Sequence, residues 1–145
     1  MDYVKTRKII TLAAADMIAR SAELEAINKQ ARVVIAVVDD HGKPILLRRL
    51  DQTQVASVDV AIDKARTAAT FRRPSRDIEE QVRGGRFGAL ALAGAVALQG
   101  GIPLTVDGHV VGAIGVSRET PAEDEAVALA GARALAEGAN ARGNS

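Results

Sequence analysis

Apolar residues recur at helical spacing over the beginning of the chain. From about Tyr3 to Asn28 they fall every three or four positions, which predicts one long helix. Asn28 is suited to end that helix because asparagine tolerates the left-handed conformation. The apolar positions that carry this prediction are Ile10, Ala13, Ala14, Met17, Ile18 and Leu24.

Two hairpins are predicted where turn residues separate aliphatic runs. The stretch "RVVIAVVDDHGKPILLRRL", residues 32–50, has Asp, Gly and Pro at its centre, and "IPLTVDGHVVGAIGVS", residues 102–117, turns at Asp107-Gly108. Residues 33–38 are apolar at every position, so both faces of this strand are expected to be covered. It is therefore predicted to be a central strand.

Capping residues and glycines set the bounds of three further helices. Ser57 is predicted to cap a helix that ends near Thr70, and Pro74-Ser75 to begin a shorter one that Gly84-Gly85 ends. Thr120-Pro121 opens the last helix, followed by three acidic residues that suit its N-terminal dipole. The Ala-rich segment "ALALAGAVALQGG", residues 89–101, fits a helix or a strand, and its last part is predicted as a strand.

This order of elements predicts an α+β fold in a single domain, residues 1–145. The expected order is α-β-β-α-α-β-β-α, with an antiparallel sheet of about five strands and helices packed on it, as in profilin-like and PAS-like ligand-sensing modules. The chain is 48% hydrophobic, largely small aliphatic residues. One small core uses fewer, so we expect a homo-oligomer, a dimer or larger, to bury the remainder.

Composition excludes several functions. A net charge of +1 and three aromatic residues give neither a basic field nor stacking platforms, so no nucleic-acid partner is expected. No apolar run is long enough to span a bilayer, and the first residues lack a signal-peptide pattern, which predicts a cytoplasmic protein without a membrane partner. The sequence has no cysteine, no clustered metal-ligand pattern, no nucleophile-elbow triad and no phosphate-binding loop.

Lys64 interrupts the apolar face of a predicted helix. On a helical wheel it lies between Val60, Ala61, Ala68 and Phe71, away from the acidic and basic residues of the wet face. A lysine there must snorkel to water, meet an anion or lose its charge. A pocket lysine can bind a carboxylate or act as acid, base or amine nucleophile, and snorkelling stays open beside that reading.

Glycines near two predicted strands suggest close approach of another group. Gly100 and Gly101 stand just before a strand, where their amides can approach an anion, although an ordinary turn has the same pattern. Gly112 and Gly115 lie inside a strand, where glycine indicates a nearby ligand or a closely packed backbone. Both explanations stay open for each pair.

Four ordered motifs carry a resemblance to a known family. They are "AVVDDHGKPILLRRLD", "DKARTAATF", "GGIPLTVDGHVVGAIGVS" and "AEDEAVALAG", and together they run from about Ala36 to Gly131. In this order they resemble the GlcG/HbpS-like family, also called the haem-degrading domain, which recurs as the C-terminal domain of PduO-type cobalamin adenosyltransferases. The resemblance implies an antiparallel sheet covered by helices, oligomeric assembly, and roles that include haem binding or work in catabolic clusters.

The resemblance also implies where the ligand pocket lies. The positions that it carries over as catalytic or ligand-binding candidates are Lys64, Thr67, Gly100, Gly101, Pro103 and Ser117. Asp124 matches a family motif too, and an N-terminal helix charge explains it equally well. The family usually has glycine after "GVS", whereas this chain has Arg118, which could form a cationic rim with Lys64 and Arg48 for a carboxylate or for haem propionates.

Haem needs an axial ligand as well as cations. The residues of this chain that could coordinate the haem iron are His41, His109, Tyr3, Met1 and Met17. His41 and His109 are the axial candidates, although both fall in predicted turns, where histidine is commonly an ordinary polar residue. An oligomer could bring either turn to another subunit.

Two functions of different classes therefore stay open, and haem is the cofactor expected for the first of them. The first is a haem-binding oligomer that degrades or carries haem, which the resemblance implies. The second is a cofactor-independent tautomerase, deaminase or hydrolase that acts on a small carboxylate through Lys64 and the Gly100-Gly101 loop, with Arg118. A non-catalytic sensor of a small anionic metabolite would share that pocket without turnover.

Overall fold

The computed structural model describes residues 1–143 and follows the predicted order of elements. These are α1 (Leu12–Asn28), β1 (Val34–Asp39), β2 (Pro44–Arg49), α2 (Ala56–Phe71), α3 (Arg76–Arg83), the 3-10 helix η1 (Phe87–Ala91), β3 (Gly101–Val106), β4 (His109–Ser117) and α4 (Pro121–Gly143). The fold is α+β, as predicted.

The strands form one antiparallel sheet in the order β2-β1-β4-β3. Both predicted hairpins are present, and β1 lies inside the sheet, as its continuous apolar run predicted. Asp107 and Gly108, at the turn between β3 and β4, have φ of 52° and 77°, the left-handed values that a two-residue type I′ turn requires.

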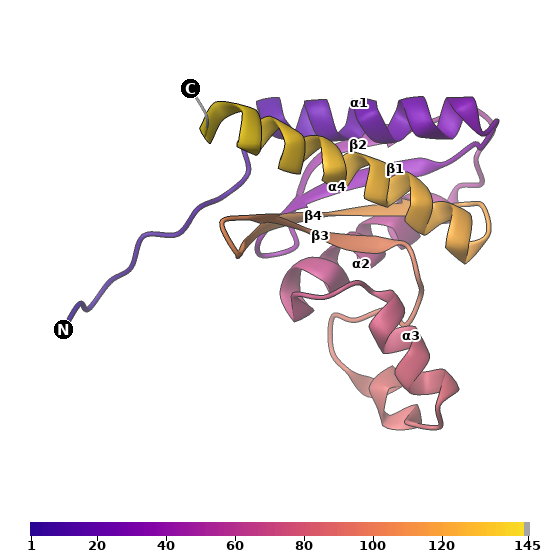
Figure 1. Ribbon diagram of the computed structural model, residues 1–145. Helices are drawn as coiled ribbons and strands as arrows, with labels where there is room; N and C mark the ends of the chain where they lie inside the picture. The colour runs from indigo at the N-terminus through magenta and orange to yellow at the C-terminus, as the bar shows by residue number, and fades with distance from the viewer. Residues whose placement is uncertain (144–145) are drawn as a thin grey trace.

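Helices cover both faces of the sheet (Figure 1). Helices α1 and α4 lie side by side on one face, α2 packs on the other, and α3 with η1 extends beyond α2. The side chains of β1 and of Val33 just before it alternate between two apolar clusters. Val33, Ile35 and Val37 face α1 and α4, whereas Val34, Ala36 and Val38 face the alanines of α2. All are fully buried, which confirms that β1 is covered on both sides.

The strand glycines serve this close packing. A Cβ atom on Gly115 would lie 2.1 Å from the carbonyl oxygen of Ala61 in α2, and one on Gly112 would lie 2.5 Å from the carbonyl oxygen of Val38. Neither site leaves room for a ligand. Of the two explanations that the sequence left open for these glycines, the structure therefore supports the closely packed backbone.

The first helix begins later than predicted. It starts at Leu12, where the hydroxyl of Thr11 accepts a hydrogen bond from the amide of Ala14. Residues 1–11 instead form an extended arm that projects from the body (Figure 1). The Ile10 amide donates to Val111 on β4, so the base of the arm follows the sheet rather than the helix axis.

Two further expectations are wrong. Ser57 lies inside α2 rather than at its cap, because Val55 is the cap and the helix starts two residues earlier than predicted, through turns closed by the carbonyls of Gln54 and Val55. The sheet has four strands within the described residues, not five, since residues 95–100 form no strand. Alanine has low strand propensity, and this segment is held by side chains instead: Thr67 accepts from the Val96 amide and Ser75 donates to the Leu98 carbonyl.

Candidate functional site

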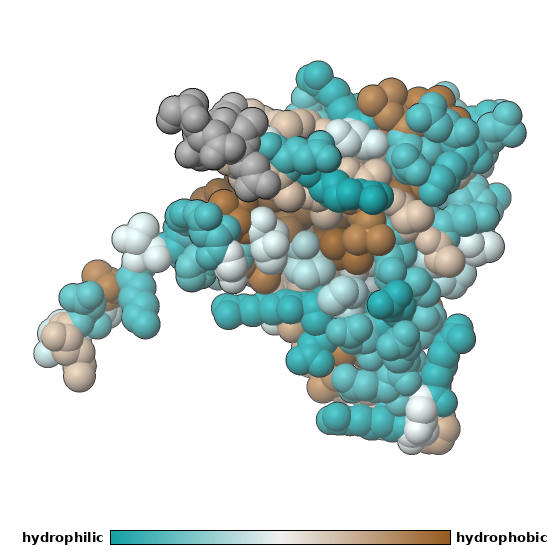
Figure 2. Space-filling model, viewed as in Figure 1, coloured by the Kyte–Doolittle hydropathy of each residue, from teal (hydrophilic) through white to brown (hydrophobic). Residues whose placement is uncertain are grey.

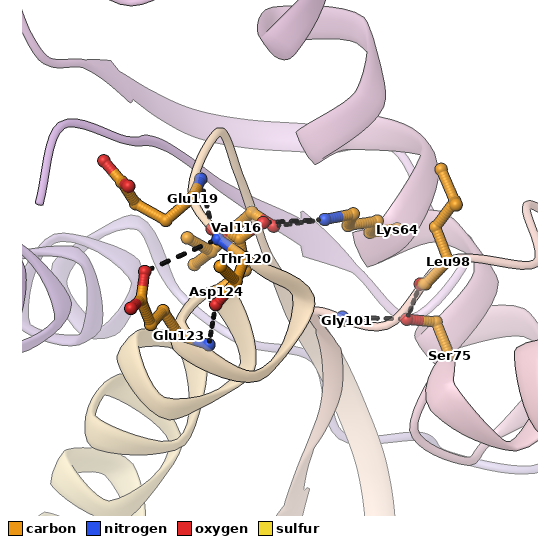
Figure 3. Close-up of polar contacts among 9 residues, drawn as sticks. All are labelled: Lys64, Ser75, Leu98, Gly101, Val116, Glu119, Thr120, Glu123 and Asp124. Carbon is orange, nitrogen blue, oxygen red and sulfur yellow. Dashed lines mark hydrogen bonds and ion pairs between the residues drawn. The ribbon is translucent and has the colours of Figure 1, made fainter.

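Lys64 is buried at the junction of three elements. Lys64 belongs to α2, and only 5% of its surface is exposed. Its ammonium donates one hydrogen bond to the backbone carbonyl of Val116 on β4 at 3.0 Å and another to the Asp124 carboxylate at 3.1 Å. Figure 3 shows the side chain reaching from α2 toward the end of β4 and the first turn of α4. Of the fates that the sequence allowed, Lys64 therefore meets an anion, and that anion belongs to its own chain.

Asp124 is held as firmly as Lys64. It lies in the first turn of α4, is 2% exposed, and accepts a second hydrogen bond from the Glu119 amide at 2.9 Å. Burial raises the pKa of the Asp124 carboxyl, and the Lys64 ammonium and the Glu119 amide oppose that rise. Asp124 is thus both an N-terminal helix charge and the partner of Lys64.

Gly100 and Gly101 make room for the lysine. A Cβ atom on Gly101 would lie 2.1 Å from the Lys64 carbonyl oxygen, and one on Gly100 would lie 2.9 Å from the Lys64 nitrogen. The Gly101 amide, for which the sequence left an external anion or an ordinary turn open, donates to the hydroxyl of Ser75 at 2.8 Å. These glycines therefore pack against Lys64, and the Gly101 amide is already engaged.

A small cleft with polar and apolar lining residues opens beside the buried pair, and we call it the Lys64 cleft. Its volume is about 210 Å³. It brings together Lys64, Asp124 and two other positions singled out in the sequence, Ser117 and Arg118. The remaining lining residues are Gln54, Val60, Glu79, Leu98, Gln99, Glu119 and Pro121.

Thr67 and Pro103, two other candidates, lie outside the lining of the Lys64 cleft. The hydroxyl of Thr67 donates to the Asp63 carbonyl and accepts from the Val96 amide, so it joins α2 to the loop before β3. Pro103 lies on β3, an edge strand, where proline is tolerated because one side of the strand has no partner.

Arg118 has a strained backbone at the rim of the cleft. Its φ is 135°, a value that favours glycine, and its side chain is exposed. The family resemblance places a glycine at this position. The conformation of the loop between β4 and α4 is therefore the one that glycine adopts freely, with an arginine held in it.

Arg48 lies on the opposite face of the sheet from Lys64. It pairs with Ile35 across β1 and β2, so its side chain points to the α1 side, where it forms ion pairs with Asp16 and Glu23. These pairs keep the guanidinium charged and lower the pKa of Asp16, chiefly through the hydrogen bond from Arg48. Within this chain Arg48 does not join Arg118 in a common rim.

The two histidines lie at the other end of the sheet from Lys64. His109 begins β4 and Ser117 ends it, and eight steps of roughly 3.4 Å separate these residues by about 27 Å. His41 lies in the exposed turn between β1 and β2, with its Nε2 atom 2.7 Å from a guanidinium nitrogen of Arg7. Arginine has no acceptor, so Nε2 accepts that hydrogen bond.

An apolar groove lies at this histidine end, beside the arm. Two adjoining cavities of about 290 and 310 Å³ share Thr11, Ala14 and Leu135. We call their union the apolar groove; its other lining residues are Lys8, Ile9, Ile10, Ala13, Met17, Val106, Val111, Gly138 and Ala139. Figure 2 shows hydrophobic surface where the arm joins the body, beneath the C-terminal part of α4. The sequence did not predict this groove, because the apolar periodicity predicts a helix over residues 3–11.

The residues that the structure describes lack two other kinds of feature. Residues 1–143 hold no group of three or more His, Cys, Asp or Glu side chains placed to bind a metal ion. Among the helices of the same residues, none has the length and apolar content needed to cross a membrane.

Comparisons with known proteins agree on one family. A family model described as haem degrading protein HbpS-like matches residues 10–133. Escherichia coli protein GlcG is 38% identical over 114 residues, which cover 79% of this chain and 85% of GlcG. A double mutant of Streptomyces reticuli HbpS superposes with a TM-score of 0.84 at 32% identity, covering 91% of this chain and 90% of HbpS. The PduOC:heme complex, at 24% identity, a TM-score of 0.79 and coverages of 87% and 94%, shares the fold.

Proposed function

We propose that this chain, which belongs to the HbpS-like family, binds haem in the apolar groove beside its N-terminal arm. The family is described by haem degradation, and a protein of the same fold has been crystallised with haem. The Lys64 cleft is too small for a porphyrin, since its volume is about 210 Å³, and a buried ion pair belongs to its lining. The apolar groove suits such a ligand better.

The observation that carries the proposal is the composition of this groove. Ligand sites of several hundred Å³ that are mostly apolar, with a few polar groups at the edge, are typical of cofactor pockets. Here aliphatic side chains from the arm, β3, β4 and α4 form the walls, and Lys8 supplies an edge cation for a propionate. Bound haem would supply iron redox chemistry, and the chain would supply apolar walls and an axial ligand.

His109 is the stronger axial candidate of the two histidines. It faces Val106 across the hairpin, and Val106 lines the groove. His41 has its Nε2 lone pair engaged by Arg7, which would have to move before iron could bind there. Met17, which also lines the groove, is the third potential ligand.

We also infer that the chain is cytoplasmic and forms a homo-oligomer, the second of which its composition predicts. Several large apolar side chains are more than half exposed in the single chain, which is more than solvent-facing surfaces commonly carry without a partner. They are Leu24, Ile27, Val55, Phe87 and Leu90. Light scattering on the purified protein, with and without hemin, would give the number of chains.

An absorbance titration of haem-free protein with hemin tests the haem proposal. We expect a saturable Soret band in the wild type and in His41→Ala, and a shifted or weakened band in His109→Ala. Met17→Leu, which keeps the apolar wall, reports whether sulfur is a ligand. Weak, unsaturable absorbance that no variant changes would mean adsorption to the surface and would refute the proposal.

A further inference from the structure

We propose that Lys64 is an amine nucleophile that forms an imine with a small 2-oxo acid bound in the Lys64 cleft. This site is separate from the apolar groove and lies at the other end of the sheet. The proposal starts from the way in which the lysine is placed. A buried amine and a buried carboxylate line one small cleft, and the proposed haem site uses none of these features.

The Lys64 nitrogen has one position left for a ligand. An ammonium carries three N–H donors, and among the described residues two acceptors receive them, the Val116 carbonyl and the Asp124 carboxylate. Lys64 also lines the cleft, so its third position is open to a molecule that enters there. The two bonds and the glycines packed against the side chain hold the nitrogen at the cleft wall.

Asp124 is placed to accept a proton from the Lys64 ammonium. Its oxygen lies 3.1 Å from the Lys64 nitrogen, within hydrogen-bonding distance. Both side chains are almost wholly buried, and a dry environment penalises two charges more than the neutral amine and acid. Burial also raises the pKa of Asp124. Asp124 can therefore accept a proton from the Lys64 nitrogen during the reaction without exchange with solvent.

The rim of the cleft indicates the class of substrate. A volume of about 210 Å³ admits a molecule of a few carbons. Arg118 stands at the exposed rim, and a guanidinium binds a carboxylate in a bidentate manner. An electrophilic carbonyl next to a carboxylate, as in a 2-oxo acid, can then reach Lys64 and Arg118 together.

The proposed step balances in protons and electrons. Lys64 gives one proton to Asp124, and the nitrogen lone pair forms a C–N bond while the carbonyl π electrons move to oxygen. That oxygen takes the proton back from Asp124. The nitrogen then gives a second proton to Asp124, and Asp124 passes this proton to the newly formed hydroxyl group. Water then leaves as the lone pair forms C=N, so ammonium and carbonyl become iminium and water, and Asp124 ends as a carboxylate.

Reductive trapping tests this step in the full-length protein. The protein is incubated with pyruvate or with acetaldehyde, borohydride is added, and intact mass and peptide mapping locate the reduced adduct. We expect one adduct per chain, mapped to Lys64, in the wild type and in Lys43→Met, which removes an exposed lysine from the β1–β2 turn. Lys64→Met should lose the adduct, and mapping on the wild type assigns the lysine even if that variant does not fold.

Two further variants test the roles of Asp124 and Arg118 separately. Asp124→Asn keeps a hydrogen-bond acceptor for Lys64 and should slow trapping by at least about tenfold, because it cannot accept a proton. Arg118→Gln should slow trapping with pyruvate by about tenfold and leave acetaldehyde, which lacks a carboxylate, unchanged. No adduct with either compound, or adducts spread over the exposed lysines, would overturn the proposal. Neither outcome bears on the hemin titration.

Discussion

The two ends of the sheet hold their ion pairs in opposite environments. At one end the Lys64 ammonium and the Asp124 carboxylate are 3.1 Å apart, with 6% and 2% of their side chains exposed. At the other end Lys8 and Asp107 are 2.8 Å apart, with 58% and 73% exposed. The distances are similar, but water screens only the second pair.

This contrast separates two ways in which a charge can serve a ligand. Lys8 and Arg7 belong to an extended arm, and water replaces their partners at little cost, so they can turn toward a bound anion. Lys64 cannot turn, because leaving Asp124 alone in the interior is expensive. The exposed end therefore suits a ligand that is captured and released, and the buried end suits chemistry at a fixed nitrogen.

Replacing Lys64 should give the largest effect. Lys64→Met leaves the buried Asp124 carboxylate without its cation, so we expect the free energy of unfolding to fall by about 3–5 kcal/mol. Lys8→Met, at the exposed end, should leave it unchanged within error. Denaturant unfolding followed by circular dichroism measures both.

A double variant checks the reason for that loss. Lys64→Met with Asp124→Leu removes both charges, and well-packed apolar replacements of a buried pair commonly restore stability. We therefore expect the double variant to recover most of the loss. If the single and double variants were equally unstable, the loss would come from packing around the lysine stem and not from an unpaired charge.

How far the sequence predicts this site depends on the range of each interaction. Local periodicity was enough to place Lys64 on the packed side of α2, and turn chemistry was enough to place both hairpins. The partner of Lys64 could not be predicted, because Asp124 lies 60 residues away and meets it only after β4 and α4 have packed. The apolar groove was missed for a related reason: the arm is extended by its contact with β4, which no local pattern reveals.

Gly101→Ala should be the next most damaging change at the Lys64 end. The added Cβ would lie 2.1 Å from the Lys64 carbonyl oxygen, so α2 or β3 must shift, at a cost of about 1–3 kcal/mol. Gly88→Ala is the matched control, since a Cβ there meets nothing within 4 Å. Thermal unfolding compares the two, and equal melting temperatures would contradict the packing role given to Gly101.

Arg118→Gly should give the smallest effect and the opposite sign. Relief of a backbone with φ of 135° should raise the free energy of unfolding by roughly 1–3 kcal/mol. The greater conformational freedom of glycine in the unfolded chain should lower it by about 0.4–1 kcal/mol. A net gain of about 1 kcal/mol should raise the melting temperature by roughly 4 °C. Arg86→Gly is the control, because Arg86 is also exposed and has an ordinary φ of −82°. It loses an arginine without relief of strain and should melt lower than the wild type.

If both variants melted lower by the same amount, the loop after β4 would store no strain, and the arginine in place of the family's glycine would have no cost in stability. If only Arg118→Gly gains, that cost is real, which fits a residue kept at the cleft for its guanidinium.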